Sequence, residues 1–445
     1  MEGSSSPQPS EPSEAGEASE RSQPGKPRSL LLSRDYLGWW AGNTVSALGT
    51  SISGIAFPLL VLYTTGSVAK AGLITAASQI GMVATTLWGG ALADRVSRKA
   101  IMIIGPVVQA AALGTVAVLV RVGHVPLATL AAMACVSGLA NGFTSGAATP
   151  ALRRLVPKAQ LATASGQMFS RDMAAEIIGS PVGGLLFTIA RWMPFGADAV
   201  SFLFASLGAA LIRRPLGPDR SAREEKSTML ADIRQGIGFV RRQPFLRFVV
   251  IWSALVNVVA GGFFLLFIAL VKYRGGSPTD VGLVTSVALI GGIAGSVAAP
   301  MILRKIRARL VMYAALWMFV VSFAGVAVAP RPWEIGVALL FGMIGLAPVN
   351  IVLEAYMTSL VPDALIGRVS AVNRFGSLSL QWSGPLVAGL LADLLGAPGG
   401  AIALVLALIP FALALHFTRA LGVLDQPIGS VSELTAPAEP DLART

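Results

Sequence analysis

Long apolar runs, separated by short polar turns, make up most of the chain. Each run reaches about the 20 residues that a helix needs to cross the hydrocarbon core of a membrane. The pattern predicts an all-α membrane protein with twelve transmembrane helices. The first six runs lie near residues 36–62, 67–93, 100–120, 125–148, 162–189 and 195–212, and the next six near 247–271, 279–302, 310–329, 334–358, 367–394 and 398–418.

Polar segments flank and divide the apolar runs. The N-terminal one is rich in Ser, Pro, Glu and Gly, a composition that cannot bury enough apolar surface to fold. The central one is rich in Arg, and its residues 229–243 predict an amphipathic surface helix. We expect a disordered cytoplasmic N-tail (1–33), a six-helix half (34–212), a cytoplasmic linker (213–246), a second six-helix half (247–420) and a cytoplasmic C-tail (421–445).

Positive charge is distributed unevenly over the predicted loops. Of the 34 Lys and Arg residues, 26 fall on the side that carries both tails and the linker, six fall on the opposite side, and two fall within spans. Loops rich in Lys and Arg remain in the cytoplasm. We therefore expect a multi-pass protein of the plasma (inner) membrane with both termini in the cytoplasm.

The composition supports a membrane protein and excludes several other classes. Of the 445 residues, 54% are hydrophobic and 13% are charged, whereas soluble domains carry about 25% charged residues. The net charge of +11 does not indicate nucleic-acid binding, because the cations cluster at the ends of apolar runs rather than on one face. The single cysteine, Cys135, excludes an intrachain disulfide and a cysteine-rich metal site. No phosphate-binding loop or nucleophile–His pair appears, so we expect no enzyme, metal or cofactor.

The two halves repeat each other. Residues 155–186 align without gaps to 360–391, and ten of the 32 positions are identical. Two parallel halves related about the membrane normal are a transporter architecture, with a binding site near the midplane. The repeat contains glycines that let neighbouring helices approach closely, either as a fixed packing seam or as a moving one. These glycines are Gly179, Gly183 and Gly184 in the first half and Gly384 and Gly389 in the second.

A short charged turn joins the second and third apolar runs. Its sequence, GALADRVSRKAIM, begins at Gly90 and carries Asp94, Arg95, Arg98 and Lys99. The cations place the turn on the cytoplasmic side. The turn is either a simple positive-inside signal or part of a gate between helices.

This turn resembles the signature loop between helices 2 and 3 of the major facilitator superfamily, G-x-L-A-D-R-x-G-R-[RK]. The resemblance implies that Asp94 and Arg95 lock the cytoplasmic gate in the outward-open state. The stretch GSPVGGLL at 179–186 resembles the antiporter motif on helix 5 of efflux members. The layout as a whole looks like the efflux-type branch that contains macrolide-efflux and enterobactin-exporter proteins.

Charged residues inside predicted spans are costly in a membrane and point to function. Asp172 and Glu176 are one helical turn apart and share a face of the fifth predicted helix. Arg171 precedes them, and Arg374 on the eleventh helix is a candidate partner from the other half. The group is either a proton-coupling site, in which we favour Glu176 as the proton carrier, or a structural ion pair.

Uncharged polar residues within the spans are candidates for the lining of a cavity. Each of them either faces the substrate or hydrogen-bonds to a neighbouring helix. The candidates are Asn43, Gln79, Asn141, Asn257, Asn350 and Gln381.

The resemblance and the spans together predict an exporter of a small amphipathic molecule, such as a drug, a secondary metabolite or a siderophore-like compound. We expect alternating access driven by proton antiport, in a monomer whose partners are the substrate, protons and the lipid bilayer, with no nucleic acid. Two alternative functions are compatible with the same sequence. One is a lysolipid or lipid flippase on the same fold, and the other is a non-transporting membrane receptor or scaffold.

Overall fold

The structure is a computed structural model, and it describes residues 33–93, 96–214 and 229–426. Over these ranges the chain forms helices and no strands. The first half consists of α1 (Arg34–Gly54), α2 (Ala56–Thr65), α3 (Val68–Ala93), α4 (Arg98–Val122), α5 (Leu127–Leu155), α6 (Leu161–Ile189) and α7 (Met193–Ala210).

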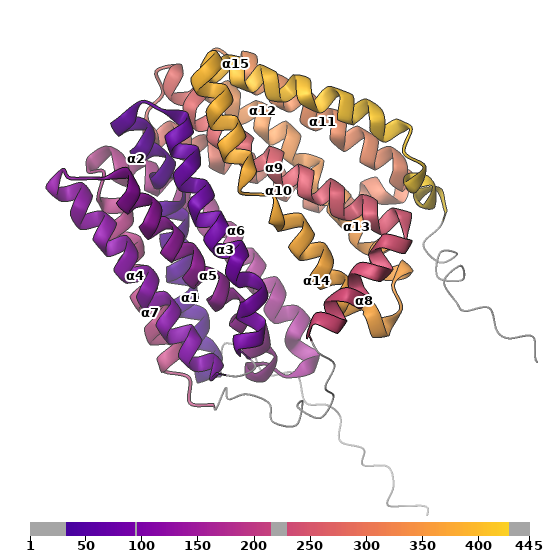
Figure 1. Ribbon diagram of the computed structural model, residues 1–445, viewed down its shortest axis with the longest axis horizontal. Coiled ribbons are helices and arrows are strands. Elements are labelled where there is room, and N and C mark those ends of the chain that lie inside the picture. The colour runs from indigo at the N-terminus through magenta and orange to yellow at the C-terminus, as the bar shows by residue number, and fades with distance from the viewer. Residues whose placement is uncertain (1–32, 94–95, 215–228, 427–445) are drawn as a thin grey trace, which may run out of the picture.

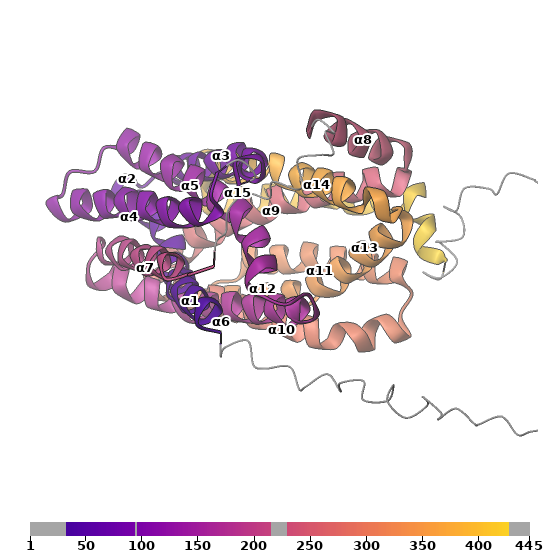
Figure 2. The ribbon, with the colours of Figure 1, turned by 90° about the horizontal axis from the view of Figure 1, so that it is seen from below.

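The second half follows the linker and begins with a short helix before its own spans. That short helix, α8, confirms the amphipathic helix predicted at 229–243, and it packs against α14 at the periphery (Figure 2). The helices are α8 (Met229–Arg242), α9 (Pro244–Tyr273), α10 (Pro278–Lys305), α11 (Ala308–Val328), α12 (Pro332–Ile344), α13 (Leu346–Leu360), α14 (Asp363–Ser379) and α15 (Ser383–His416).

Eleven helical stretches in the described residues are long and apolar enough to cross a membrane. The last of them, Leu365–His416, has 52 residues. A straight helix of that length would extend for about 78 Å, more than twice the thickness of the hydrocarbon core, about 30 Å. Gly396 divides it, because its φ of 76° is not helical. The stretch therefore contains two spans, and the predicted all-α membrane fold with two six-helix halves is confirmed.

The two halves lie side by side and meet mainly along two pairs of helices. The contacts join α6 to α10 and α3 to α15. We call the end of the bundle where α1 begins and the linker attaches the linker end, and the opposite end the loop end. The halves meet at the loop end and diverge toward the linker end (Figure 1). The backbones of the two halves are thus in contact at the loop end and further apart at the linker end (Figure 1).

Three spans are interrupted, a feature that the apolar runs did not predict. α1 ends at Gly54, α12 ends at Ile344, and a turn at 380–382 separates α14 from α15. Each break lies four residues before a proline, at Pro58, Pro348 and Pro385 respectively. Proline has no N–H to donate to the carbonyl four residues earlier, and its ring crowds that carbonyl. The breaks thus have a local cause in the sequence.

Large apolar side chains cover much of the outer surface. Ile251, Val297 and Leu394 are 64%, 70% and 79% exposed. In water so much exposed apolar area would be an association surface, but on helices of this length it is the surface that faces lipid.

Candidate functional site

A cavity of about 540 Å³ lies between the halves, and most of its lining comes from the N-terminal half. Helices α1, α4, α5 and α6 supply polar side chains to this wall. The lining includes Asn43, Gln109, Asn141, Arg171, Asp172 and Glu176. We call this the polar cavity, because its lining can bind a polar or charged group.

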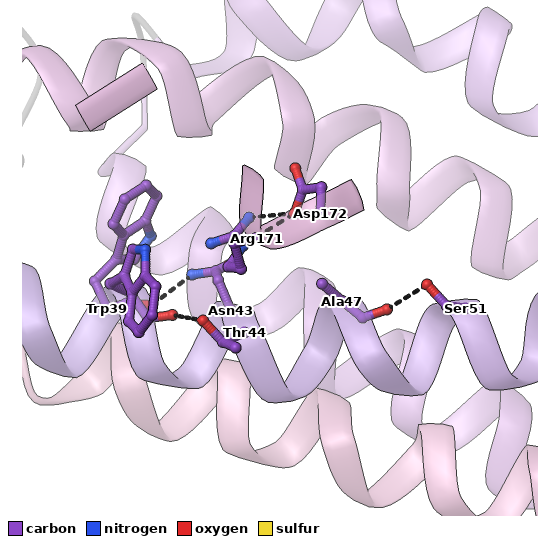
Figure 3. A network of polar contacts seen from close by, with 8 residues as sticks. Trp39, Asn43, Thr44, Ala47, Ser51, Arg171 and Asp172 are labelled. Carbon is purple, nitrogen blue, oxygen red and sulfur yellow. Dashed lines mark hydrogen bonds and ion pairs between the residues drawn. The ribbon is translucent and has the colours of Figure 1, made fainter. Parts of the chain in front are cut away.

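Arg171 and Asp172 form an ion pair on α6 beside α1 (Figure 3). The Nη2 and Nε atoms of Arg171 donate to Oδ1 of Asp172 at 2.7 and 2.9 Å. The Arg171 side chain is only 8% exposed, whereas that of Asp172 is 55% exposed. The Arg171 cation is thus held inside the wall by a carboxylate that faces the cavity.

Arg374, the predicted partner from the other half, does not join this pair. It is exposed on α14, and no residue in the described ranges forms an ion pair with it. Arg171 instead pairs with its own sequence neighbour. Adjacent helical residues diverge by about 100° around the axis, so the pair depends on the length of the arginine side chain.

Glu176 lies at the junction of this polar cavity and a second, more apolar one. It lines both of them, together with Phe264 and Thr285. Its carboxylate is exposed to the cavity and has no ion pair or hydrogen bond within the described residues. Glu176 is therefore a charged group without a fixed partner, at the boundary between two chemical environments.

The second cavity, of about 360 Å³, is lined chiefly by aromatic and aliphatic side chains of the C-terminal half. Phe263 and Phe323 stack with ring centroids 3.7 Å apart, and Trp252 stacks on Phe411 at 5.5 Å. Glu176 is the one charged residue in the described lining. Such a wall suits the apolar part of a ligand.

The structure places the six polar candidates in two groups. Four of them line the cavities, Asn43 and Asn141 the polar one and Asn257 and Asn350 the apolar one. The other two, Gln79 and Gln381, are not part of either lining, and the Oε1 atom of each is buried without a hydrogen-bond partner. Asn43 and Asn257 each donate to the carbonyl one turn earlier in their own helix.

One buried carboxylate, Asp198 on α7, was not among the residues predicted from the sequence. It is 1% exposed and accepts hydrogen bonds from Ser53 Oγ at 2.5 Å and Ser201 Oγ at 2.9 Å. Gly49 provides the space, because a Cβ there would lie 2.7 Å from Oδ1 of Asp198. An Asp within an apolar run could have been predicted as a functional candidate. Asp198 was not, because it lies near the start of its run, where a carboxylate is usually exposed to water.

The five glycines of the repeat lie at close helix contacts. A Cβ at Gly179 would lie 2.6 Å from Ser51 Cβ, and one at Gly183 would overlap Ile52 of the same α1. Gly384 packs on α9 within the C-terminal half. Gly184 and Gly389 differ from these, because they pack against the other half, on the first residues of α10 and α3 respectively.

The residues of the charged turn are only partly described. Gly90 lies near the end of α3, while Asp94 and Arg95 are outside the described residues. Arg98 is buried at the start of α4. Lys99 Nζ donates to the carbonyl of Ile212 at 2.6 Å, beyond the end of α7, where the helix dipole favours a cation. Lys99 therefore joins two helices of the same half, and the roles of Asp94 and Arg95 remain predictions.

Two six-helix halves around a central cavity define an integral membrane protein of the transporter class. The sequence pattern of the Major Facilitator Superfamily matches residues 39–380. The chain belongs to this family, whose members are membrane transporters.

Similar proteins support this assignment. Multidrug efflux pump Tap of Mycolicibacterium fortuitum is 28% identical over 396 residues, which cover 85% of this chain and 94% of the pump. Macrolide efflux protein A of Streptococcus pyogenes is 24% identical over 263 residues, which cover 57% of this chain and 64% of that protein.

Solved structures show the same fold. A mutant of the nucleoside transporter NupG aligns with a TM-score of 0.71 and 13% identity, covering 86% of this chain and 100% of that one. A bacterial homologue of the human lysosomal transporter Spinster aligns with a TM-score of 0.69 and 15% identity, covering 89% and 99%.

Proposed function

We propose that the chain is a drug efflux transporter that exports small amphipathic molecules by alternating access, in exchange for protons. The observation that carries the proposal is the position of Glu176, an exposed carboxylate that lines both the polar and the aromatic cavity. A substrate that occupies both cavities would place its polar group beside this carboxylate. Substrate and proton can then compete for one group, which is the physical basis of antiport.

The substrate class follows from the two walls. The aromatic wall offers apolar surface with few hydrogen-bonding groups, and the polar wall offers amides, hydroxyls and the Arg171–Asp172 pair. The two cavity volumes fall within the range of about 300–1,000 Å³ that is typical of small-molecule sites. The relatives named as a multidrug pump and a macrolide efflux protein support a drug-like molecule.

The direction of transport follows from the orientation. With the linker and both termini in the cytoplasm, the state described here opens toward the cytoplasm and is closed at the loop end. An exporter loads its substrate in this state. The plasma membrane is the membrane in which such export would protect a cell.

Transport of a probe by the purified protein in proteoliposomes tests the function. Vesicles with an acidic lumen should accumulate a macrolide or the cationic dye ethidium when the linker end faces outward, and should lose protons as they do so. Excess lysophosphatidylcholine should not compete. Lysolipid movement without movement of either probe would favour a flippase, and no movement of probe, proton or lipid would favour a scaffold.

Labelling of single cysteines tests the orientation. In a Cys135→Ala background, Leu230→Cys on α8 should react with an impermeant maleimide only after the cells are permeabilised. His124→Cys, in the turn between α4 and α5, is the matched control at the loop end and should react in intact cells. Labelling of position 230 in intact cells would contradict cytoplasmic termini.

A further inference from the structure

The turn between α2 and α3 is the point where the loop end of the N-terminal half contacts charged residues of the C-terminal half. The turn consists of Gly66 and Ser67. Asp393 of α15 and Lys272 of α9 border it from the other half, around a shallow hollow at the loop end. Each of them binds a different helix end.

Asp393 binds the N-terminus of α3. Its Oδ2 accepts a hydrogen bond from Ser67 Oγ at 2.6 Å, and its Oδ1 accepts one from the backbone N–H of Val68 at 2.8 Å. The first N–H groups of a helix have no partner within the helix, and the positive end of the dipole favours an anion there. Asp393 thus supplies a helix cap across the boundary between the halves.

Lys272 binds the C-terminus of α2. Its Nζ donates to the carbonyl of Leu62 at 2.7 Å and lies 4.5 Å from the centre of the Tyr63 ring. The last carbonyls of a helix favour a cation, and an aromatic face adds to that attraction. The two charges of the C-terminal half therefore match the signs of the two helix ends that flank the turn.

The equivalent helix of the other half caps itself. At the start of α10, Ser277 and Asp280 form a capping box, in which the backbone N–H and Oγ of Ser277 donate to Asp280 at 2.7 and 2.8 Å. In α3, Ser67 Oγ likewise accepts a hydrogen bond from the backbone N–H of Lys70 at 3.1 Å, but the side chain of Lys70 cannot accept one in return. α3 thus has the serine member of the capping box and receives the acidic member from Asp393.

Lys272 and its neighbour Arg274 bind helix ends in different halves of the protein. Arg274 donates to the carbonyls of Val326 and Ala327 at 3.2 and 2.6 Å, at the end of α11 in its own half. Two pairs of charges at the loop end therefore perform the same kind of capping. Asp280 and Arg274 act within one half, whereas Asp393 and Lys272 act between halves.

We propose that Asp393 and Lys272 form a latch that holds the loop end closed while the cavity is open to the linker end. Separation of the halves at the loop end breaks the bonds of both charges at once and leaves the two helix ends to water. Asp393 is exposed, so water can replace its partners and the latch can reopen. The latch rests on the proposed alternating access and orientation, but not on a particular substrate or on proton coupling.

Accessibility of the cavity from outside intact cells tests the latch. Ala47, which lines the polar cavity, is changed to Cys in a Cys135→Ser background and labelled with an impermeant maleimide. Asp393→Asn combined with Lys272→Met should raise the labelling rate by about tenfold, the effect expected for the loss of two charged helix caps. The assay needs no substrate, so its failure is distinct from a failure of drug export.

The cation that acts within one half provides the matched control. Arg274→Gln removes a positive charge from the same end of the protein, and it should leave the labelling of Ala47→Cys unchanged, whereas Lys272→Met alone should raise it. An equal rise in Arg274→Gln and Lys272→Met would show general loosening of the loop end and overturn the latch. An unchanged rate in the Asp393 and Lys272 variant, at normal membrane levels, would also overturn it.

A third variant tests the latch without touching either of its charges. Lys70→Asp gives α3 an acidic residue in the place that Asp280 occupies in α10, and it puts a second negative charge near Asp393. External labelling should rise as in the double variant, whereas Lys70→Gln should have little effect. Normal external labelling in Lys70→Asp would contradict the inference that α3 depends on a cap from the other half.

Discussion

Replacing Glu176 by Gln is expected to abolish the accumulation of substrate that a proton gradient drives. Glutamine keeps the size and hydrogen-bonding capacity of the side chain but cannot exchange a proton. Because Glu176 lines both cavities and has no fixed partner within the described residues, substrate binding and downhill exchange should persist in part. Accumulation in proteoliposomes should fall by more than about tenfold, because glutamine cannot take up and release the proton whose movement would drive it.

Asp172→Asn is the matched control for this prediction. Asp172 lies one turn before Glu176 and holds the nearly buried Arg171. Its loss leaves a buried cation without a counter-charge, which costs stability. Asp172→Asn should therefore lower the yield of folded protein and the midpoint of thermal unfolding, while the protein that remains still responds to the proton gradient. Retained uphill transport in Glu176→Gln, with unchanged proton dependence, would place coupling at another residue.

Adding a methyl group at Gly184 is expected to prevent the loop end from closing. A Cβ there would lie 2.8 Å from the Cα of Thr279 and would overlap the carbonyl of Pro278, both in the backbone of the other half. Such overpacking costs about 1–3 kcal/mol, enough to shift the equilibrium constant between the two states away from the one described here by about 5- to 150-fold. Gly184→Ala should insert normally, transport poorly and expose the cavity to external reagents.

Two further variants test whether the effect arises from the contact between the halves. Gly389→Ala, at the equivalent place in the repeat, should act in the same direction, because its Cβ would lie 2.7 Å from the Cα of Ala69. Gly166→Ala lies on the same helix as Gly184 but meets no atom within 4 Å, and it should transport normally. Normal transport in Gly184→Ala, or an equal defect in Gly166→Ala, would show that this contact does not control closure.

The fold was predictable because a membrane imposes a length and an apolar composition on every span. Those two requirements located the twelve spans, and the repeat of residues 155–186 at 360–391 established two related halves. Helix α8 was equally predictable, since amphipathic periodicity is a local property. The three interrupted spans were not predicted, although Pro58, Pro348 and Pro385 mark them, because many prolines in spans do not break their helix.

The candidate site was only partly predictable, because it depends on how helices distant in the sequence meet. Glu176 was identified from its type and its place in a span. Its lack of a partner, and the separation of Arg374 from Arg171, became visible only with the helices in place. The aromatic wall of the second cavity combines residues of α9, α11 and α15, and no local pattern distinguishes those residues from ordinary helix-packing residues.

The division of the cavity into a polar wall from one half and an aromatic wall from the other has an evolutionary consequence. Substitutions in α9, α11 or α15 can reshape the compartment for the apolar part of the substrate without altering Glu176, Asp172 or Arg171. If the chain exports drugs as proposed, selection for resistance to a new compound can act on the second half of the gene while the first half stays unchanged. Chimeras that exchange the second half between relatives would then inherit their substrate spectrum from one parent and their energy source from the other.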